Sequence, residues 1–223
     1  MTKIKICGIK TLSDALAAIE AGADYLGFNF YSKSARFIDM PECAKITSAL
    51  KAEHPHIKLV GVFVNTPVAD IQAILQTCSL DLAQLHGDES AETHAQLAPN
   101  AFKAFRGVPA NLDVHARNEA PACLIDASVK GAYGGTGVTA DWPATAELAK
   151  RHPLLLAGGL TPDNVAAAVR QVRPWGVDVA SGVEVPSQLG AKDAGRMKAF
   201  VQAVRSVTES KSGRERVSIQ MEK

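Results

Sequence analysis

The feature that most constrains the fold of this chain is an alternation that continues from one end to the other. Short runs of β-branched and apolar residues alternate with longer, alanine-rich amphipathic stretches, which is the pattern of repeated strand–helix units. Strands are predicted over residues 3–7, 25–30, 58–64, 82–85, 101–105, 122–126, 154–157 and 176–179. Helices are predicted over residues 11–23, 41–51, 67–77, 90–98, 141–151, 162–170 and 192–207, with Pro41, Pro67 and Pro162 in first turns.

The even spacing of these units favours a single-domain α/β fold, the closed (β/α)8 or TIM barrel, over residues 1–207. An open doubly wound sheet would need a G-x-G-x-x-G turn after its first strand, and CGIKTLSD does not supply one. The last segment, 208–223, is polar and lacks sustained periodicity, so we expect a disordered tail outside the barrel.

Composition limits the partners of the chain. It has 24 basic and 23 acidic side chains, a formal net charge of +1, so no overall field would attract nucleic acid or an anionic membrane. No apolar run approaches the roughly 20 residues of a membrane span. The four cysteines are widely spaced and no charged-then-apolar leader precedes them, which predicts reduced thiols in a cytoplasmic protein. An anionic ligand would have to be held locally.

In such a barrel the reactive side chains lie at the carboxyl ends of the strands. Mostly polar or ionisable residues occupy those ends here, and packing alone would not choose them. The candidates are Cys7, Asn29, Asn65, His86, Arg106, Asp126 and Asp178.

Two glycine-containing turns follow the last two strands. Gly158 and Gly159 come after the seventh, and Ser181 and Gly182 after the eighth, where barrels bind phosphate through backbone N–H groups. The alternative is that the two adjacent glycines only permit a tight turn. A third glycine-rich segment, 130–137, lacks the Lys-Ser/Thr of a nucleotide loop. It is predicted to be a lid that includes Gly134, Gly135 and Gly137, or else a slack surface loop.

Two side chains are candidates for proton transfer. Asp126 emerges from an apolar strand, whose surroundings penalise a charged carboxylate and favour a proton donor. Cys7 shares a strand face with Lys3 and Lys5, and a nearby ammonium favours the thiolate. On local grounds alone, Asp126 could instead cap a turn and Cys7 could be an inert buried residue.

Arg36 and His86 are weaker candidates. Arg36 lies in the long loop after the second strand, where its guanidinium could hold a carboxylate through two hydrogen bonds or simply be solvated. His86 ends the fourth strand, and a lone histidine is more often structural than catalytic.

Taken together, these segments resemble the phosphoribosylanthranilate isomerase family of tryptophan biosynthesis, over about residues 3–206. The motifs that carry the resemblance are KICGI (5–9), GADYLGFNFYSKSAR (22–36), VGVFVN (60–65), QLHGDE (84–89), IDA (125–127), GAYGGTG (131–137), LAGGLTPDNV (156–165) and GVDVASGVE (176–184). The resemblance implies a barrel that catalyses the Amadori rearrangement of N-(5-phosphoribosyl)anthranilate, a phosphosugar, without cofactor or metal.

The resemblance also implies roles for the residues. Cys7 would be the general base and Asp126 the general acid. Arg36 would hold the anthranilate carboxylate. Gly158, Gly159, Ser181 and Gly182 would hold the phosphate, while His86 and Asp178 would line the pocket. One departure is Ala180, which stands where the family usually has serine, so one phosphate or packing contact is in doubt.

Two other readings remain open at this point. Another phosphosugar barrel is the nearer one, but indole-glycerol-phosphate synthase should present a lysine where Asn29 or Asn65 stands, and the histidine-pathway isomerase an aspartate where Cys7 stands. The second is a barrel that binds a phosphate ligand without catalysis. Whether the chain is a monomer or a homodimer is also left open.

Overall fold

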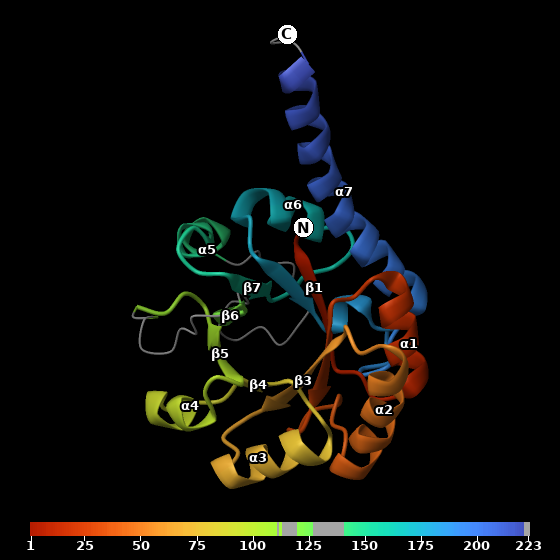
Figure 1. The fold of residues 1–223 in the computed structure, drawn as a ribbon, viewed down its shortest axis with the longest axis vertical. Coiled ribbons are helices and arrows are strands. Elements are labelled where there is room, and N and C mark those ends of the chain that lie inside the picture. Colours follow the sequence, from red (N-terminus) through yellow and green to blue (C-terminus); the bar gives the residue numbers. More distant parts are fainter. Residues whose placement is uncertain (111, 113–119, 127–140, 221–223) are drawn as a thin grey trace.

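The computed structural model describes residues 1–110, 112, 120–126 and 141–220, with side chains described up to residue 207. Eight parallel strands close into a barrel in sequence order, and β8 pairs with β1 through Ile4 and Val177. Figure 1 shows the ring of strands with the helices outside it. The predicted (β/α)8 barrel is confirmed. The strands are β1 Lys3–Cys7, β2 Tyr25–Asn29, β3 Lys58–Phe63, β4 Leu82–Leu85, β5 Ala101–Arg106, β6 Cys123–Asp126, β7 Leu154–Ala157 and β8 Gly176–Val179.

The helices follow the predicted positions, and local capping explains their ends. For example, the Thr11 side chain accepts a hydrogen bond from the backbone N–H of Asp14, and Gly22 ends the same helix in the left-handed conformation at φ 104°. The helices are α1 Leu12–Ala21, α2 Met40–Glu53, α3 Val68–Thr77, α4 Ala91–Leu97, α5 Trp142–Ala149, α6 Val165–Val172 and α7 Ala194–Gln220, with a 3-10 turn η1 at Ser181–Val183.

The prediction for the three prolines is only partly right. Pro41 lies in the first turn of α2, whereas Pro67 is the N-cap residue of α3. Pro162 precedes α6 altogether, so the predicted first-turn position is wrong there.

The cause is a side chain that stabilises a non-helical turn before α6. The Asn164 amide oxygen accepts from Thr161 N at 2.8 Å, and its amide nitrogen donates to Gly159 O at 2.9 Å. These bonds hold the chain in a turn, so the helix begins only at Val165.

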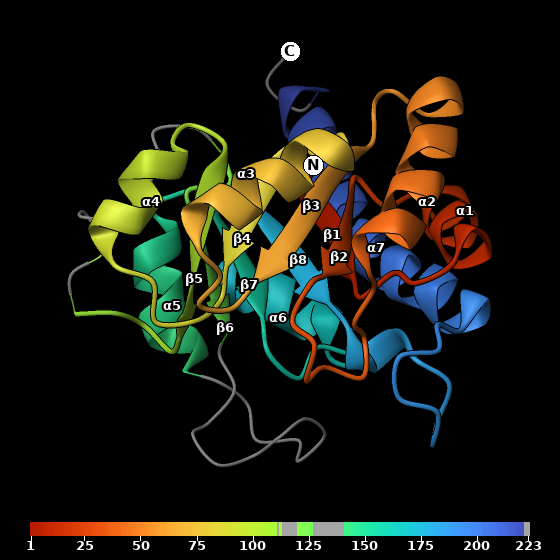
Figure 2. The ribbon, with the colours of Figure 1, turned by 90° about the horizontal axis from the view of Figure 1, so that it is seen from below.

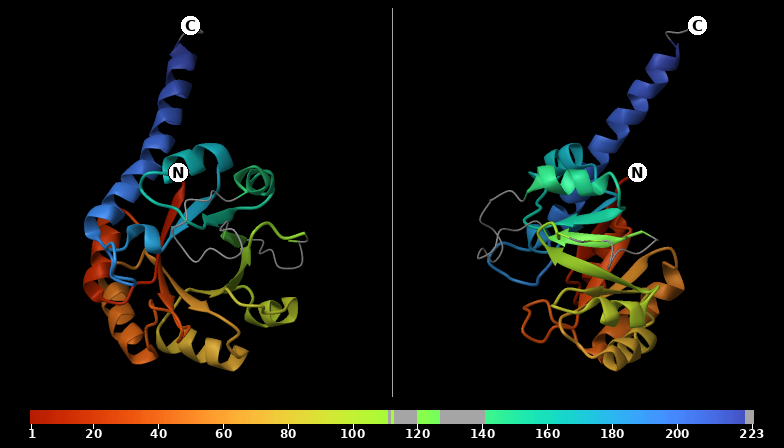
Figure 3. Two further views of the ribbon diagram at one scale, coloured as in Figure 1. Left: turned by 180° about the vertical axis from the view of Figure 1, so that it is seen from behind. Right: turned by 90° about the vertical axis from the view of Figure 1, so that its left-hand side faces the viewer.

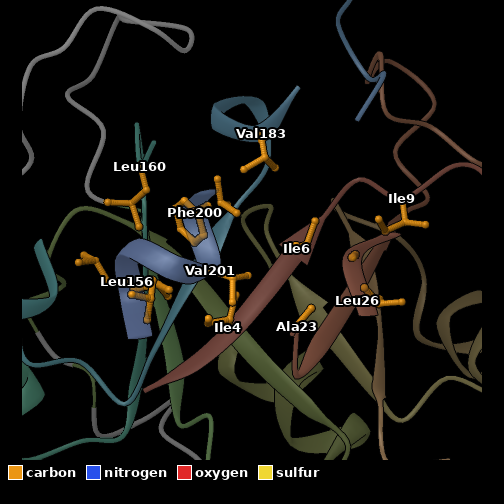
Figure 4. Close-up of a cluster of buried hydrophobic side chains, with 14 of the residues drawn as sticks. Ile4, Ile6, Ile9, Ala23, Leu26, Leu156, Leu160, Val183, Phe200 and Val201 are labelled. Carbon is orange, nitrogen blue, oxygen red and sulfur yellow. The ribbon is translucent and has the colours of Figure 1, made fainter. Parts of the chain in front are cut away.

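Alternate residues of each strand face opposite sides of the barrel wall. On β1, Ile4 and Ile6 face outward and belong to the cluster that includes Phe200 and Val201 of α7, as Figure 4 shows. A second buried cluster lies inside the barrel: Tyr25, Val60, Leu82, Phe102, Ala104, Leu124, Leu155 and Ala157. Tyr25 and Leu82 begin their strands, whereas Ala157 ends β7 and also borders the cavity at the other end. The polar side chains inside the barrel therefore lie at the carboxyl ends of the strands.

Helix α7 is longer than the sequence predicts. The predicted helix ended at residue 207, whereas α7 continues to Gln220 and extends away from the barrel in both views of Figure 3. Six of the 13 residues in the extension are Lys, Arg, Glu or Gln, which favour helix, whereas Gly213 and three serines do not. The division into a barrel and a separate tail therefore stays a prediction. Nowhere in the described ranges is a helix both long and apolar enough to cross a membrane.

Candidate active site

A cavity of about 250 Å³ opens at the carboxyl ends of the strands. The loops that follow β2 and β8 lie at this end, as Figure 2 shows. The two loops are in close contact, because a Cβ added at Gly190, after β8, would lie 2.6 Å from the backbone oxygen of Ala35, after β2. The cavity is lined by Cys7, Asn29, Arg36, Val62, Gln84, His86, Asp126, Ala157, Gly158, Gly159, Leu160, Asp178, Ala180 and Ser181.

Cys7 ends β1 and shares a small space with a buried ammonium. Its strand partner is Gly27, and a Cβ added at Gly27 would lie 2.8 Å from Cys7 Sγ and 3.0 Å from Lys5 Nζ. Lys5 has no exposed surface, and its Nζ donates to Asp178 Oδ1 at 2.8 Å. The absence of a side chain at Gly27 therefore lets the thiol and the ammonium lie together.

Burial of Lys5 opposes its charge, but the neighbouring Asp178 and Cys7 outweigh that effect and raise the pKa of Lys5 above its ordinary value. Lys5 therefore stays an ammonium beside Cys7, as the strand periodicity predicts. Lys3, which the same periodicity places on this face, instead pairs with Asp24 at 2.7 Å.

Asp126 faces a histidine across the cavity wall. His86 Nε2 lies 3.9 Å from Asp126 Oδ2, and His86 Nδ1 lies 2.9 Å from the amide nitrogen of Gln84. Burial lowers the pKa of His86, although the charges of Asp126 and Asp178 oppose this. The imidazole is therefore neutral near neutral pH, so His86 faces Asp126 as an uncharged group.

The turns after β7 and β8 line the cavity through Gly158, Gly159 and Ser181. Gly158 and Gly159 adopt positive φ values of 96° and 63°, which glycine tolerates without strain. Only glycine fits at position 182, because an added Cβ would lie only 1.8 Å from Leu160 O. Arg196 donates to Gly182 O through Nε at 3.2 Å and Nη2 at 3.1 Å, which stabilises this turn from outside.

Arg36 reaches the cavity from the loop after β2 and is paired with a carboxylate of the chain itself. Its Nε and Nη2 donate to the two carboxylate oxygens of Glu184 at 2.6 and 2.8 Å. Gly8 makes room for it, since an added Cβ there would lie 2.6 Å from Arg36 Cδ. The guanidinium thus has one edge held by Glu184 while the side chain lines the cavity.

Lys192 connects this pair to the turn after β8. It has no exposed side-chain surface, and its Nζ donates to Glu184 Oε1 at 3.0 Å and to Ala180 O at 2.9 Å. Burial favours the neutral acid, but hydrogen bonds from Arg36 and the charge of Lys192 outweigh it and lower the pKa of Glu184. Glu184 is therefore a carboxylate between two cations.

A metal ion has no evident place in the described parts of the chain, since no three His, Cys, Asp or Glu side chains there gather in a way that could hold one.

Comparisons with known proteins show the family of this chain. A family model described as N-(5'phosphoribosyl)anthranilate (PRA) isomerase matches residues 4–203. The N-(5'-phosphoribosyl)anthranilate isomerase of Roseiflexus sp. (strain RS-1) is 45% identical over 219 residues, which cover 94% of this chain and 100% of the relative. The chain belongs to this family. It is an intramolecular aldose–ketose isomerase with PRA isomerase activity in tryptophan biosynthesis, so the resemblance read from the sequence is confirmed.

Solved structures of the family superpose on this barrel. The crystal structure of phosphoribosyl anthranilate isomerase from Thermotoga maritima has a TM-score of 0.80 and 36% identity, covering 92% of this chain and 100% of its own. Another PRA isomerase structure, at TM-score 0.76 and 34% identity over 92% and 100% of the chains, is in complex with reduced 1-(o-carboxyphenylamino)-1-deoxyribulose 5-phosphate.

The predicted site residues of the isomerase are almost all brought together. Those that line the one cavity are Cys7, Arg36, His86, Asp126, Gly158, Gly159, Asp178 and Ser181. Gly182 supports the turn beside it. Gly134, Gly135 and Gly137, the predicted lid, lie outside the described residues.

Sequence reasoning missed several residues of the isomerase site. Gln84 could have been found, because it lies two residues before His86 on the same strand face. Glu184 stands in the GVDVASGVE motif, but its partner Arg36 is 148 residues away, so no local pattern could join them. The role of Gly27 can be recognised only once the β1–β2 register places it beside Cys7. No sequence pattern around Lys192 indicates that it contacts this site.

Proposed function

We propose that Asp126 and Cys7 carry out the isomerisation of N-(5'-phosphoribosyl)anthranilate as general acid and general base. Asp126 gives its proton to the furanose ring oxygen, the C1–O bond breaks, and the anthranilate nitrogen lone pair forms a protonated C1=N Schiff base. Cys7 thiolate then takes the C2 proton, and the C–H electron pair forms the C1=C2 bond of an enolamine. Loss of the O2 proton and protonation at C1 give the ketone.

The observation that carries this proposal is that Cys7 and Asp126 line one cavity, from β1 and β6 of the barrel. The protonated imine already makes the C2 proton acidic, so positioning accounts for much of the remaining catalysis. Lys5, held by Asp178, places a positive charge beside the sulfur that would take the C2 proton.

The two anionic ends of the substrate would be held at separate places. We assign the phosphate to the turns of Gly158, Gly159, Ser181 and Gly182, because backbone N–H groups after the last two strands suit a phosphate. Arg36 would hold the anthranilate carboxylate with the part of its guanidinium that Glu184 does not occupy. Both proposals need the negative groups to lie at opposite ends of the sugar, as they do in this substrate.

His86 and Asp178 are assigned to the pocket wall, and the segment with Gly134, Gly135 and Gly137 is proposed to close over bound substrate. For Ala180, its carbonyl keeps a bond to Lys192, so the family's usual serine would add only a side-chain hydroxyl. We propose a cytoplasmic enzyme whose partner is this phosphosugar and which binds neither nucleic acid nor membrane. It is a monomer or a homodimer; the relative from Thermotoga maritima is described as dimeric.

The test uses the loss of anthranilate fluorescence as substrate turns over. Cys7→Ser and Asp126→Asn are each expected to lower kcat by on the order of 10² or more, the usual scale for loss of a general acid or base. Cys123→Ala is the matched control, because Cys123 is fully buried on the outward face of β6. Turnover near the wild-type rate in either catalytic variant would remove that residue from its role.

A further inference from the structure

Three side chains form a row from the barrel interior to the mouth of the cavity. Gln84 and His86 lie two residues apart on one face at the end of β4, and Asp126 ends β6. The amide nitrogen of Gln84 lies 2.9 Å from His86 Nδ1, and His86 Nε2 lies 3.9 Å from Asp126 Oδ2. Exposure rises along the row, from 1% for Gln84 to about a quarter for the side chains of His86 and Asp126.

The orientation of the Gln84 amide determines where His86 carries its proton. When the amide nitrogen donates to Nδ1, that ring nitrogen is an acceptor without a proton, so neutral His86 has its proton on Nε2. Nε2 is the nitrogen that faces Asp126. A rotated amide would accept from Nδ1–H and leave Nε2 as an acceptor.

This orientation leaves a buried group without a partner. Gln84 Oε1 is buried, and no described residue donates a hydrogen bond to it. A buried amide oxygen without a donor is unfavourable, and such groups concentrate where function uses them. The orphaned oxygen therefore points to a requirement at the other end of the amide, the bond to His86.

The charges around His86 come from four strands. Asp126 and Asp178 favour the imidazolium, whereas Lys5 and Arg106 oppose it. Burial is the largest influence and lowers the pKa of His86, so the ring is neutral when Gln84 donates to it.

We propose that Gln84 is a positioning residue that holds His86 as the neutral imidazole protonated on Nε2, ready to donate a hydrogen bond to Asp126. This rests on the proposed role of Asp126 as general acid. Asp126 becomes a carboxylate when its proton passes to the ring oxygen of the sugar, and His86 Nε2–H then approaches from 3.9 Å and stabilises that charge. The imidazole keeps its proton throughout.

The tautomer is measured without reference to turnover. Long-range ¹H–¹⁵N spectra of the full chain labelled with ¹⁵N-histidine report which ring nitrogen carries the proton, and the spectrum of His86→Asn assigns the signal among the six histidines. We expect the Nε2–H form for His86 between pH 7 and 8. A proton on Nδ1 in the wild type would overturn the inference.

Two variants at Gln84 then change the protonation of His86 in different ways. Gln84→Met removes the donor, so His86 should become a mixture of tautomers. Gln84→Glu provides an acceptor for Nδ1–H, so both ring nitrogens should be protonated at pH 7. The second variant keeps the size of the side chain and remains informative if the first does not fold.

The catalytic consequence in Gln84→Met is a kcat lowered in proportion to the Nε2–H form that is lost, about twofold for an even mixture of tautomers. Gln84→Glu keeps the Nε2 proton but adds a positive charge beside Asp126, so it should change the pH profile of kcat. Gln72→Met makes the same exchange on the exposed face of α3 and should leave kcat unchanged. A tautomer shift with a wild-type kcat across the pH range would show that the positioning does not serve catalysis. If Asp126→Asn alone kept full turnover while the tautomer result held, the acid assignment would fail instead.

Discussion

The two ends of the barrel interior are built from the same strands but have opposite character. Toward the amino ends, Leu82 and Leu124 belong to an apolar cluster. Two residues further along the same strands, Gln84 and Asp126 line the cavity. Two residues along one strand therefore separate a side chain that stabilises the fold from one that lines the cavity. We expect stability and catalysis to be changed independently by substitutions at these neighbouring positions.

The largest effect is expected where this separation is incomplete, at the buried ion pair of the polar end. Lys5→Met leaves Asp178 as an uncompensated buried charge, so the free energy of unfolding should fall by about 3–5 kcal/mol. Denaturant titration measures it. The double variant Lys5→Met/Asp178→Leu should recover stability but not turnover; a single variant as stable as the wild type would contradict the prediction.

The second prediction compares neighbouring positions on β6. Leu124 is fully buried, so Leu124→Ala should lower the free energy of unfolding by about 2–5 kcal/mol while kcat of the folded enzyme stays near the wild-type value. Asp126→Asn should leave the free energy of unfolding near the wild-type value and lower kcat. Thermal unfolding and fluorescence assays on both proteins check this. The comparison breaks if both variants lose stability and turnover in the same proportion.

The third prediction concerns the space shared by thiol and ammonium. Gly27→Ala places a methyl group within 3.0 Å of both groups, so overpacking should cost about 1–3 kcal/mol. The alkylation rate of Cys7 by iodoacetamide should fall too, because the ammonium is displaced. Unchanged alkylation would mean that Lys5 does not influence the thiol.

The smallest effect is a pH dependence at the rim. The folded-state pKa of Glu184 is lowered, so its contribution to stability is fully present above the ordinary carboxyl value of 4.5 and is lost as pH falls through the lowered value. Glu184→Gln should therefore flatten the stability profile below pH about 4.5. Unfolding midpoints at several acidic pH values measure it, and parallel profiles for the two proteins would contradict the assignment.

Much of the fold could be predicted because each strand is an apolar run bounded by polar residues, and eight such runs allow few closed arrangements. The catalytic end followed from topology, since parallel strands bring their carboxyl ends to one face. The start of α6 was missed because the Asn164 side chain stabilises a turn that Pro162 alone does not reveal. The pairing of Arg36 with Glu184 was missed because only the closed barrel brings these distant residues together.

Lys192 gives the site a fixed span. It joins the turn after β8, where we assign the phosphate, to the carboxylate that holds Arg36, where we assign the anthranilate end. If both assignments hold, we expect a molecule whose two anionic ends were closer together or farther apart to fit less well, because this fully enclosed ammonium keeps both of its bonds. Discrimination by substrate length would then be built into the fold before substrate binds.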